Sequence, residues 1–161
     1  MSAANRAMAA RLQDEASNPH INVFVTANAG SGKTKTLIDR VARLLLRGVE
    51  PQRILCLTYT KAAATEMQNR LFQRLGGWAM LTDARLRADL TELGEGPRFG
   101  PDDLARARRL FARALETPGG LRIQTIHSFC ATLLRRFPLE AGISPGFSEL
   151  DDRAARLLRR M

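Results

Sequence analysis

Residues 27–34, which read Ala-Asn-Ala-Gly-Ser-Gly-Lys-Thr, have the types and spacing needed to hold a polyphosphate. Gly30 and Gly32 let the backbone curl, so that several N–H groups converge at the positive end of the helix that follows. Lys33 adds a full positive charge beside the β- and γ-phosphates, and the Thr34 hydroxyl is placed to ligate Mg²⁺. We therefore expect a nucleoside triphosphate site here, with Lys33 and Thr34 closest to the chemistry.

The segments on either side of this loop favour phosphate binding over a chance glycine-rich turn. Residues 21–26 are mostly apolar, which predicts a buried strand leading into the loop. Residues 34–47 then predict an amphipathic helix, which Gly48 and Pro51 end. Its apolar face consists of Leu37, Ile38, Val41, Leu44 and Leu45. Ala27 replaces the usual first glycine of such loops, and that position tolerates a methyl group.

Two further strand–helix units follow along the chain. A strand is predicted at 53–58 before a helix at 62–75, and another strand at 121–125 before a helix at 128–137. The helix at 62–75 aligns Ala63, Met67, Leu71 and Leu75 and carries a Glu66–Arg70 pair. Short apolar strands that alternate with helices indicate an α/β fold with a parallel sheet and flanking helices.

Residues 76–120 are predicted to form a helical insert between the second and third strands. One helix covers 83–93 and another covers 102–116, before a glycine-rich stretch closes the insert. The inner side of the second helix is expected to consist of Leu104, Ala107, Phe111 and Leu115. Residues 151–161 begin another helical pattern that stops abruptly, so we expect the chain to be truncated there.

Length and composition bound the class of protein. At 161 residues and 45% hydrophobic content, the chain is long enough for one globular domain with a core. No apolar stretch approaches the length of a membrane span, and residues 1–17 lack the apolar core of a signal peptide, so a cytoplasmic protein without membrane contact is expected. Cys56 and Cys130 are expected to be small buried hydrophobes, neither a disulfide nor metal ligands.

The net charge of +9 favours a polyanionic partner such as nucleic acid. Two arginine stripes also have a plainer explanation, because each lies on one helix face away from the apolar residues, as on any solvated face. These stripes are Arg40, Arg43 and Arg47, and Arg106, Arg109 and Arg113. Charge alone therefore leaves both interpretations open.

All three predicted strand ends carry hydroxyl or basic groups and open a helix. Parallel sheets bind ligands beyond the carboxyl ends of their strands, where the free N–H groups of a following helix also point. The groups are Thr26 before Lys33 and Thr34, then Thr58 to Lys61, then Thr125 to Ser128. We expect the first end to hold ATP and the other two to face phosphates or a sugar-phosphate backbone. The alternatives are simple N-caps at Thr60 and Ser128 and a structural role for His127.

Four segments, in order along the chain, resemble the motifs of UvrD-like superfamily 1 helicases. Gln13 with Ala16 and Pro19 resembles the Q motif, and residues 27–34 resemble motif I. Ile-Leu-Cys-Leu-Thr-Tyr-Thr-Lys-Ala-Ala-Ala-Thr-Glu-Met at 54–67 and Ile-Gln-Thr-Ile-His-Ser-Phe-Cys at 123–130 resemble motifs Ia and Ib. The chain is most similar to the AddA branch, the helicase–nuclease subunits of bacterial double-strand break repair.

This resemblance implies a P-loop NTPase (RecA-like) fold and a division of the chain. Residues 1–20 would be an N-terminal segment with the Q motif, 21–150 the ATP-binding motor domain 1A, and 151–161 the start of a helical subdomain. It implies ATP and Mg²⁺ as cofactors, single-stranded or double-stranded DNA as substrate, and a partner in the form of an AddB-like nuclease subunit. The implied activity is ATP-dependent 3′ to 5′ DNA unwinding in double-strand break repair and recombination.

The resemblance also assigns roles to individual residues. The nucleotide set is Gln13, Ala27, Asn28, Ala29, Gly30, Ser31, Gly32, Lys33, Thr34 and Lys35, with Gln13 on the adenine and Thr34 on the metal. The DNA set is Thr58, Thr60, Lys61, Thr125 and His127. Lys61-Ala62 stands where UvrD has Asn-Lys, as in the RecB and AddA branch, and Tyr59 replaces the usual phenylalanine.

Hydrolysis needs a carboxylate on Mg²⁺ and a base that orients water, normally an Asp-Glu pair after a further strand. Asp14-Glu15 follows no strand, and the resemblance places Asp151-Asp152 before that motif. We therefore expect this chain alone to bind ATP weakly and to turn it over poorly. A small P-loop kinase acting on a metabolite and a non-catalytic ATP- or DNA-binding module are the alternative functions.

Overall fold

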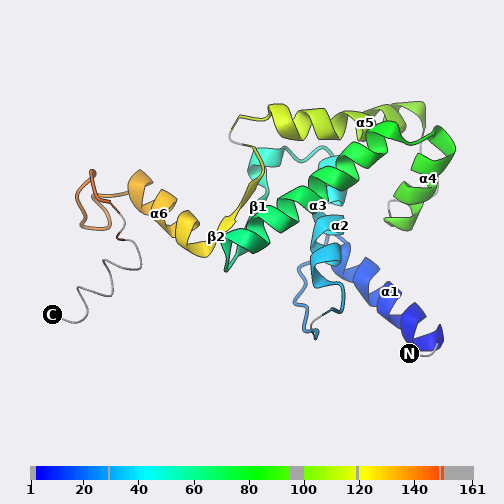
Figure 1. The fold of residues 1–161 in the computed structure, drawn as a ribbon, viewed down its shortest axis with the longest axis horizontal. Coiled ribbons are helices and arrows are strands. Elements are labelled where there is room, and N and C mark those ends of the chain that lie inside the picture. Colours follow the sequence, from blue (N-terminus) through cyan, green and yellow to red (C-terminus); the bar gives the residue numbers. More distant parts are fainter. Residues whose placement is uncertain (1–2, 29, 95–99, 119, 149, 151–161) are drawn as a thin grey trace.

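The computed structural model describes residues 3–28, 30–94, 100–118, 120–148 and 150 (Figure 1). The helices within them are α1 (Ala3–Ser17), α2 (Lys33–Leu46), α3 (Lys61–Met80), α4 (Asp83–Glu92), α5 (Pro101–Glu116) and α6 (Ile126–Arg136), with a 3-10 turn at Pro51–Arg53. The strands are β1 (Leu55–Thr58) and β2 (Arg122–Thr125). The predicted α/β class is confirmed, and α3, α4 and α5 lie between the two strands along the sequence.

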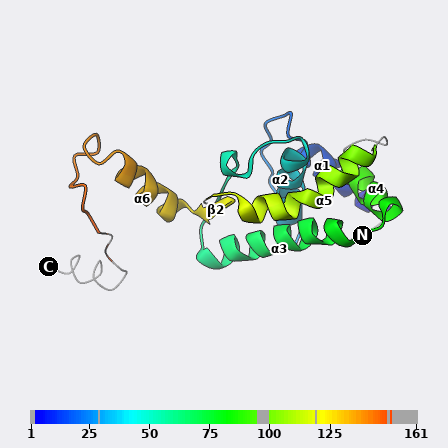
Figure 2. The same cartoon turned by 90° about the horizontal axis from the view of Figure 1, so that it is seen from above.

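The two strands form a parallel sheet, as predicted. They are in register from Leu55 opposite Arg122 to Thr58 opposite Thr125, so both strands end at the same edge. Helices α3 and α6, which begin at that edge, pack against both strands. Figures 1 and 2 show α6 leading away from the other helices beyond the end of β2.

Residues 21–26 do not form a strand, so that prediction was wrong. The segment from 22 to 28 has no regular secondary structure and is exposed, with Phe24 at 94%. A strand needs a neighbour for its N–H and C=O groups, and in the described part of the chain β1 and β2 pair only with each other. The apolar pattern of 21–26 therefore indicated a tendency to be buried, but it did not show that a neighbouring strand is present to pair with.

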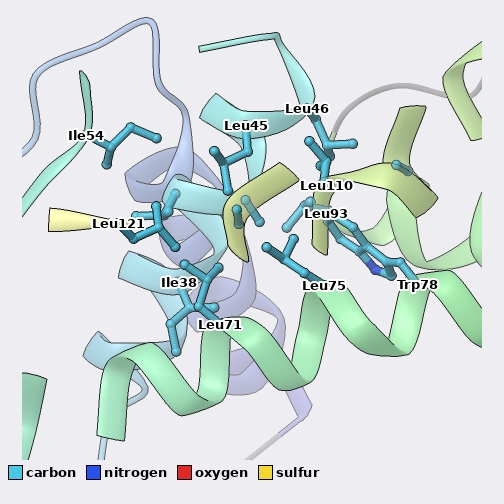
Figure 3. Packing of buried hydrophobic residues seen from close by; sticks show 14 of the residues in the cluster. Ile38, Leu45, Leu46, Ile54, Leu71, Leu75, Trp78, Leu93, Leu110 and Leu121 are labelled. Carbon is cyan, nitrogen blue, oxygen red and sulfur yellow. The ribbon is translucent and has the colours of Figure 1, made fainter. Parts of the chain in front are cut away.

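The hydrophobic core lies between α2, α3 and α5 (Figure 3). Ile38 of α2 and Leu71 and Leu75 of α3 are buried and face one another across this core. Helix α3 continues beyond its predicted end through Gly76, where an added Cβ would contact the Phe111 ring of α5 at 3.6 Å. This is an ordinary van der Waals distance, so α5 packs along α3 with room for a methyl group at this position.

Three helix faces differ from the predicted ones. Ala63 is exposed, and its neighbour Ala64 is buried instead. On α5, Leu115 is 55% exposed and Leu110 takes the inner position at 2%, while Leu37 of α2 is 40% exposed. Neighbouring residues are about 100° apart around a helix. Where two apolar residues compete for one face, the packing partner decides which is buried.

The two cysteines have different surroundings. Cys56 is buried in β1 as predicted, and burial raises the pKa of its thiol to about 11. Cys130 is exposed, contrary to prediction, because α6 has few neighbours and buries only Ala131. Both thiols are free in this structure. No helix in the described ranges is long and apolar enough to cross a membrane.

Candidate nucleotide and nucleic-acid site

The phosphate loop joins the irregular segment 22–28 to α2. Gly30 and Gly32 have φ angles of 76° and 88°, which residues other than glycine rarely adopt. The Ser31 hydroxyl donates to the Asn28 carbonyl at 2.7 Å and closes the turn between them. The loop therefore has the glycine-dependent curl that the sequence predicts. Ala29, also predicted to bind the nucleotide, lies outside the described residues.

The Lys33 ammonium lies against the backbone of its own loop. Its Nζ atom donates to the carbonyl oxygens of Ala27 at 2.6 Å and Asn28 at 2.7 Å. Lys33 and Thr34 are both exposed at the first turn of α2, where the positive end of the helix dipole lies. The cation, the hydroxyl and the helix end are thus together and accessible to a ligand.

Helix α2 begins without a side-chain cap, because Gly32 occupies the N-cap position. The two helices at the sheet edge differ in this respect. The Thr60 hydroxyl accepts from the Ala63 N–H at 3.1 Å, and the Thr125 hydroxyl accepts from the Ser128 N–H at 3.1 Å. Thr60 is therefore an N-cap, as the alternative held, whereas Ser128 lies inside the first turn that Thr125 caps. The uncapped N–H groups of α2 are suited to an anion.

Gln13 reaches the phosphate loop from α1, a helix that the sequence did not predict. Its Nε2 atom donates to the Ser31 carbonyl at 3.0 Å. A Cβ atom at Gly32 would lie only 2.8 Å from Nε2, so the glycine also makes room for this amide. A pocket of about 530 Å³ between α1 and the 21–27 segment is lined in part by Gln13, Ser31 and Lys33.

Lys35 contacts Asp39 and not the loop. Its Nζ atom lies 2.9 Å from Asp39 Oδ2, one helical turn further along α2. The second carboxylate oxygen of Asp39 is ion-paired with Arg74 of α3. Sequence reasoning missed Asp39, although the i, i+4 spacing to Lys35 is the usual signal for such a pair. Helix α2 is thereby joined to α3 by charge as well as by apolar packing.

The arginine stripe of α2 is not a solvated face, so the plainer of the two explanations left open by the sequence does not hold for it. Arg43 is only 4% exposed and Arg40 is half-buried, whereas Arg47 is exposed. The cause is α1, which packs on this side of α2. The second stripe, Arg106, Arg109 and Arg113 on α5, is exposed, which agrees with both explanations.

The five predicted DNA-binding residues lie at the edge where β1 and β2 end. The parallel register puts Thr58 beside Thr125, and the Thr58 hydroxyl donates to the Thr60 carbonyl at 3.0 Å. Lys61 and His127 are exposed in the first turns of α3 and α6. The structure thus brings a cation and an imidazole to neighbouring strand ends, where both can face phosphate oxygens. The hydroxyl protons of Thr58 and Thr125 are already donated, to the Thr60 carbonyl and to Ser128 Oγ, and Thr125 is only 7% exposed.

Tyr59 lies between Thr58 and Thr60 and is 85% exposed. An aromatic ring that is this exposed offers a face on which a base can stack. Sequence reasoning noted Tyr59 only as a substitution for phenylalanine and did not include it among the DNA-binding residues. Its position at the tip of β1 was the signal that could have identified it.

Comparison with known proteins places this geometry in a family. The model of the UvrD/REP helicase N-terminal domain matches residues 8–160. The chain is 35% identical to an ATP-dependent helicase/nuclease subunit of Enterococcus faecalis over 137 residues. This aligned stretch covers 85% of this chain and 9% of that protein. The proteins of the same name from Desulforamulus reducens and Lactobacillus gasseri are 36% identical over 141 residues and 34% over 149, covering 86% and 91% of this chain and 10% of each relative.

The chain therefore spans about a tenth of the length of these relatives. The matched range, 8–160, contains Gln13, the phosphate loop and both strand ends. A match over this range does not favour a separate small kinase. The chain belongs to the UvrD/REP helicase N-terminal domain family.

Proposed function

We propose that this chain is the N-terminal ATP-binding part of an ATP-dependent DNA helicase that acts in double-strand break repair and recombination, with 3′ to 5′ unwinding. The observation that carries the proposal is the phosphate loop, with its lysine and uncapped helix, inside a family match that spans nearly the whole chain. The relatives are named as helicase/nuclease subunits. We extend to this protein a cytoplasmic location, nuclease participation and an AddB-like partner subunit on that similarity alone.

The nucleotide site fits ATP with Mg²⁺. The N–H groups at the start of α2 and the Lys33 ammonium would hold the phosphates, and the exposed Thr34 hydroxyl would be the protein's ligand to the metal. Bound Mg²⁺ would neutralise phosphate charge during transfer to water. Lys33 would have to exchange the carbonyls of Ala27 and Asn28 for phosphate oxygens. Lys35 would approach the nucleotide only by leaving Asp39.

The edge formed by Thr58, Thr60, Lys61, Thr125 and His127 would contact DNA. Helix α3 begins at this edge and packs against α2, so a displacement of α2 during the ATP cycle would reach the strand ends through α3. We assign 21–150 to motor domain 1A, with the helices between residues 76 and 120 as an insert in it and 1–20 as a preceding segment. No Asp-Glu pair follows β1 or β2, so we expect slow hydrolysis by this chain alone.

Two lysine variants of the natural full-length protein test this function. Lys33→Ala should abolish DNA-stimulated ATPase and unwinding while sparing DNA binding, because it removes the phosphate-binding cation. Lys61→Ala removes the same charge at the sheet edge and should weaken binding to a single strand, with a shallower salt dependence, while sparing ATP binding. Normal turnover by Lys33→Ala would refute the assignment. DNA binding without any ATPase in the parent protein would indicate a non-catalytic module.

A further inference from the structure

Helix α1 is attached to α2 mainly by polar contacts. Its apolar side chains Met8 and Leu12 are 57% and 58% exposed, and Ser17 is the only buried residue among its described side chains. Arg40 of α2 donates from Nη1 to the carbonyls of Ala16 at 3.2 Å and Asn18 at 2.6 Å, at the carboxyl end of α1. Such contacts satisfy the orphan carbonyls of a helix end. The position of α1 therefore depends on arginine side chains of α2.

Arg43 makes the central contact between the two helices. Its Nη1 atom donates to the Asp14 carboxylate at 3.0 Å and to the Ser17 hydroxyl at 2.7 Å, and its Nη2 atom donates to the Gly94 carbonyl at 3.2 Å. The guanidinium is almost fully buried, so these partners replace the hydrogen bonds that it would otherwise make to water. We call Asp14, Ser17, Arg43 and Gly94 the Arg43 cluster.

Gln13 is the residue next to Asp14. On a helix these two side chains diverge by about 100°, so fixing Asp14 on Arg43 fixes the direction in which Gln13 points. Gln13 itself makes one hydrogen bond to the loop, from Nε2 to the Ser31 carbonyl. That bond uses one of the two amide hydrogens and leaves the other hydrogen and Oε1 for a base.

We propose that Arg43 and Asp14 are positioning residues that orient Gln13, and that this cluster thereby sets the preference for adenine over guanine in the nucleotide. The inference rests on the proposed function. A glutamine amide pairs with the N7 acceptor and N6 donor of adenine, whereas guanine presents an acceptor, O6, in place of that donor. A rotation of α1 would remove this discrimination without changing the groups that hold the phosphates.

Gly94 gives independent support from another element, because it lies just beyond α4. Its φ angle is 83°, and an added Cβ would collide with Asp14 Oδ1 and lie 3.1 Å from Arg43 Nη1. A methyl group here would displace the carboxylate from the guanidinium. Gly94→Ala therefore perturbs the same contact as a change at Asp14 without altering a residue of α1 or α2, and it also strains the backbone just beyond α4.

The test compares Asp14→Ala with Asp102→Ala in the natural full-length protein. Asp102 is an exposed carboxylate in the first turn of α5 with no ion pair among the described residues, so its variant changes the charge equally. Fluorescent ATP and GTP analogues report base preference, and competition by inorganic tripolyphosphate reports the phosphate site alone. Asp14→Ala should lose about 3- to 10-fold of the ATP over GTP preference, the range expected for about one hydrogen bond. It should raise KM for ATP and leave kcat and tripolyphosphate affinity unchanged.

A double-variant cycle shows whether the effect passes through Gln13. Asp14→Ala should have no further effect on selectivity in a Gln13→Ala background, and Gly94→Ala should reproduce the selectivity loss of Asp14→Ala. If Asp14→Ala lost affinity for ATP, GTP and tripolyphosphate equally, its role would be merely structural, and the inference would be overturned. Unchanged selectivity, or a parent protein without base preference, would overturn it and leave the proposed function standing. A parent protein that binds no nucleotide would overturn both.

Discussion

Asp39 allows a quantitative prediction about stability. Each of its two carboxylate oxygens pairs with a different cation, Lys35 or Arg74, and these two side chains differ in exposure. The Lys35 side chain is 59% exposed, and an exposed i, i+4 pair contributes only about 0.3–0.5 kcal/mol. Arg74 is 22% exposed against 10% for Asp39, and breaking a buried pair by removing one partner costs about 3–5 kcal/mol. Because Lys35 still compensates Asp39, we expect Arg74→Met to lower the free energy of unfolding by about 2–3 kcal/mol. Lys35→Met should lower it by less than about 1 kcal/mol.

Trp78 provides the assay, since it is the only tryptophan in the sequence. Its indole N–H donates to Asp89, and the Arg74 guanidinium lies 5.7 Å from its ring centroid, so its fluorescence reports on this network during urea unfolding. Replacing both charges, with Asp39→Leu and Arg74→Met together, should cost less than Arg74→Met alone. Equal losses for Lys35→Met and Arg74→Met would refute the reasoning, because exposure would then not govern the strength of the pairs.

The remaining predictions concern the helix caps and the cysteines. Thr60→Ala and Thr125→Ala should each lower the free energy of unfolding by about 1 kcal/mol, with the serine variants at the same positions close to the parent. A maleimide at neutral pH should label Cys130 and spare Cys56 in the folded chain. Because burial raises the Cys56 pKa from 9.0 to about 11, the unfolded chain loses this proton first. Stability should therefore fall by up to about 3 kcal/mol as pH rises from 9 to 11, and Cys56→Ala should remove that component.

Sequence periodicity predicted α2, α3, α4 and α5 because each buries one apolar face in the same core. It failed for 21–26, where apolar composition was read as a strand although strand formation also needs a partner that the pattern does not encode. It placed Leu115 inside α5 in place of Leu110, since both lie near the boundary of the apolar face. The choice between them depends on α3, which lies far away in the sequence.

The candidate site could be predicted where one short segment carries the chemistry, as at Lys33 and Thr34. It could not be predicted where two segments combine. Arg43 reads as part of a solvated stripe because α1 has a weak amphipathic pattern, and nothing local shows that α1 covers it. Likewise, Thr125 and not Ser128 caps α6. The reason is that α6 begins at Ile126, directly after the last residue of β2, with no loop between them.

The contact between the Lys33 ammonium and two carbonyls of its own loop has a kinetic consequence. The ammonium donates to both carbonyls and so links the described part of the loop to the start of α2 without a nucleotide. The conformational entropy of shaping this part of the loop is thus lost when the protein folds, and not at each encounter with a nucleotide. We therefore expect capture of a triphosphate to begin with a movement of the Lys33 side chain, and exposed side chains change rotamer in picoseconds to nanoseconds.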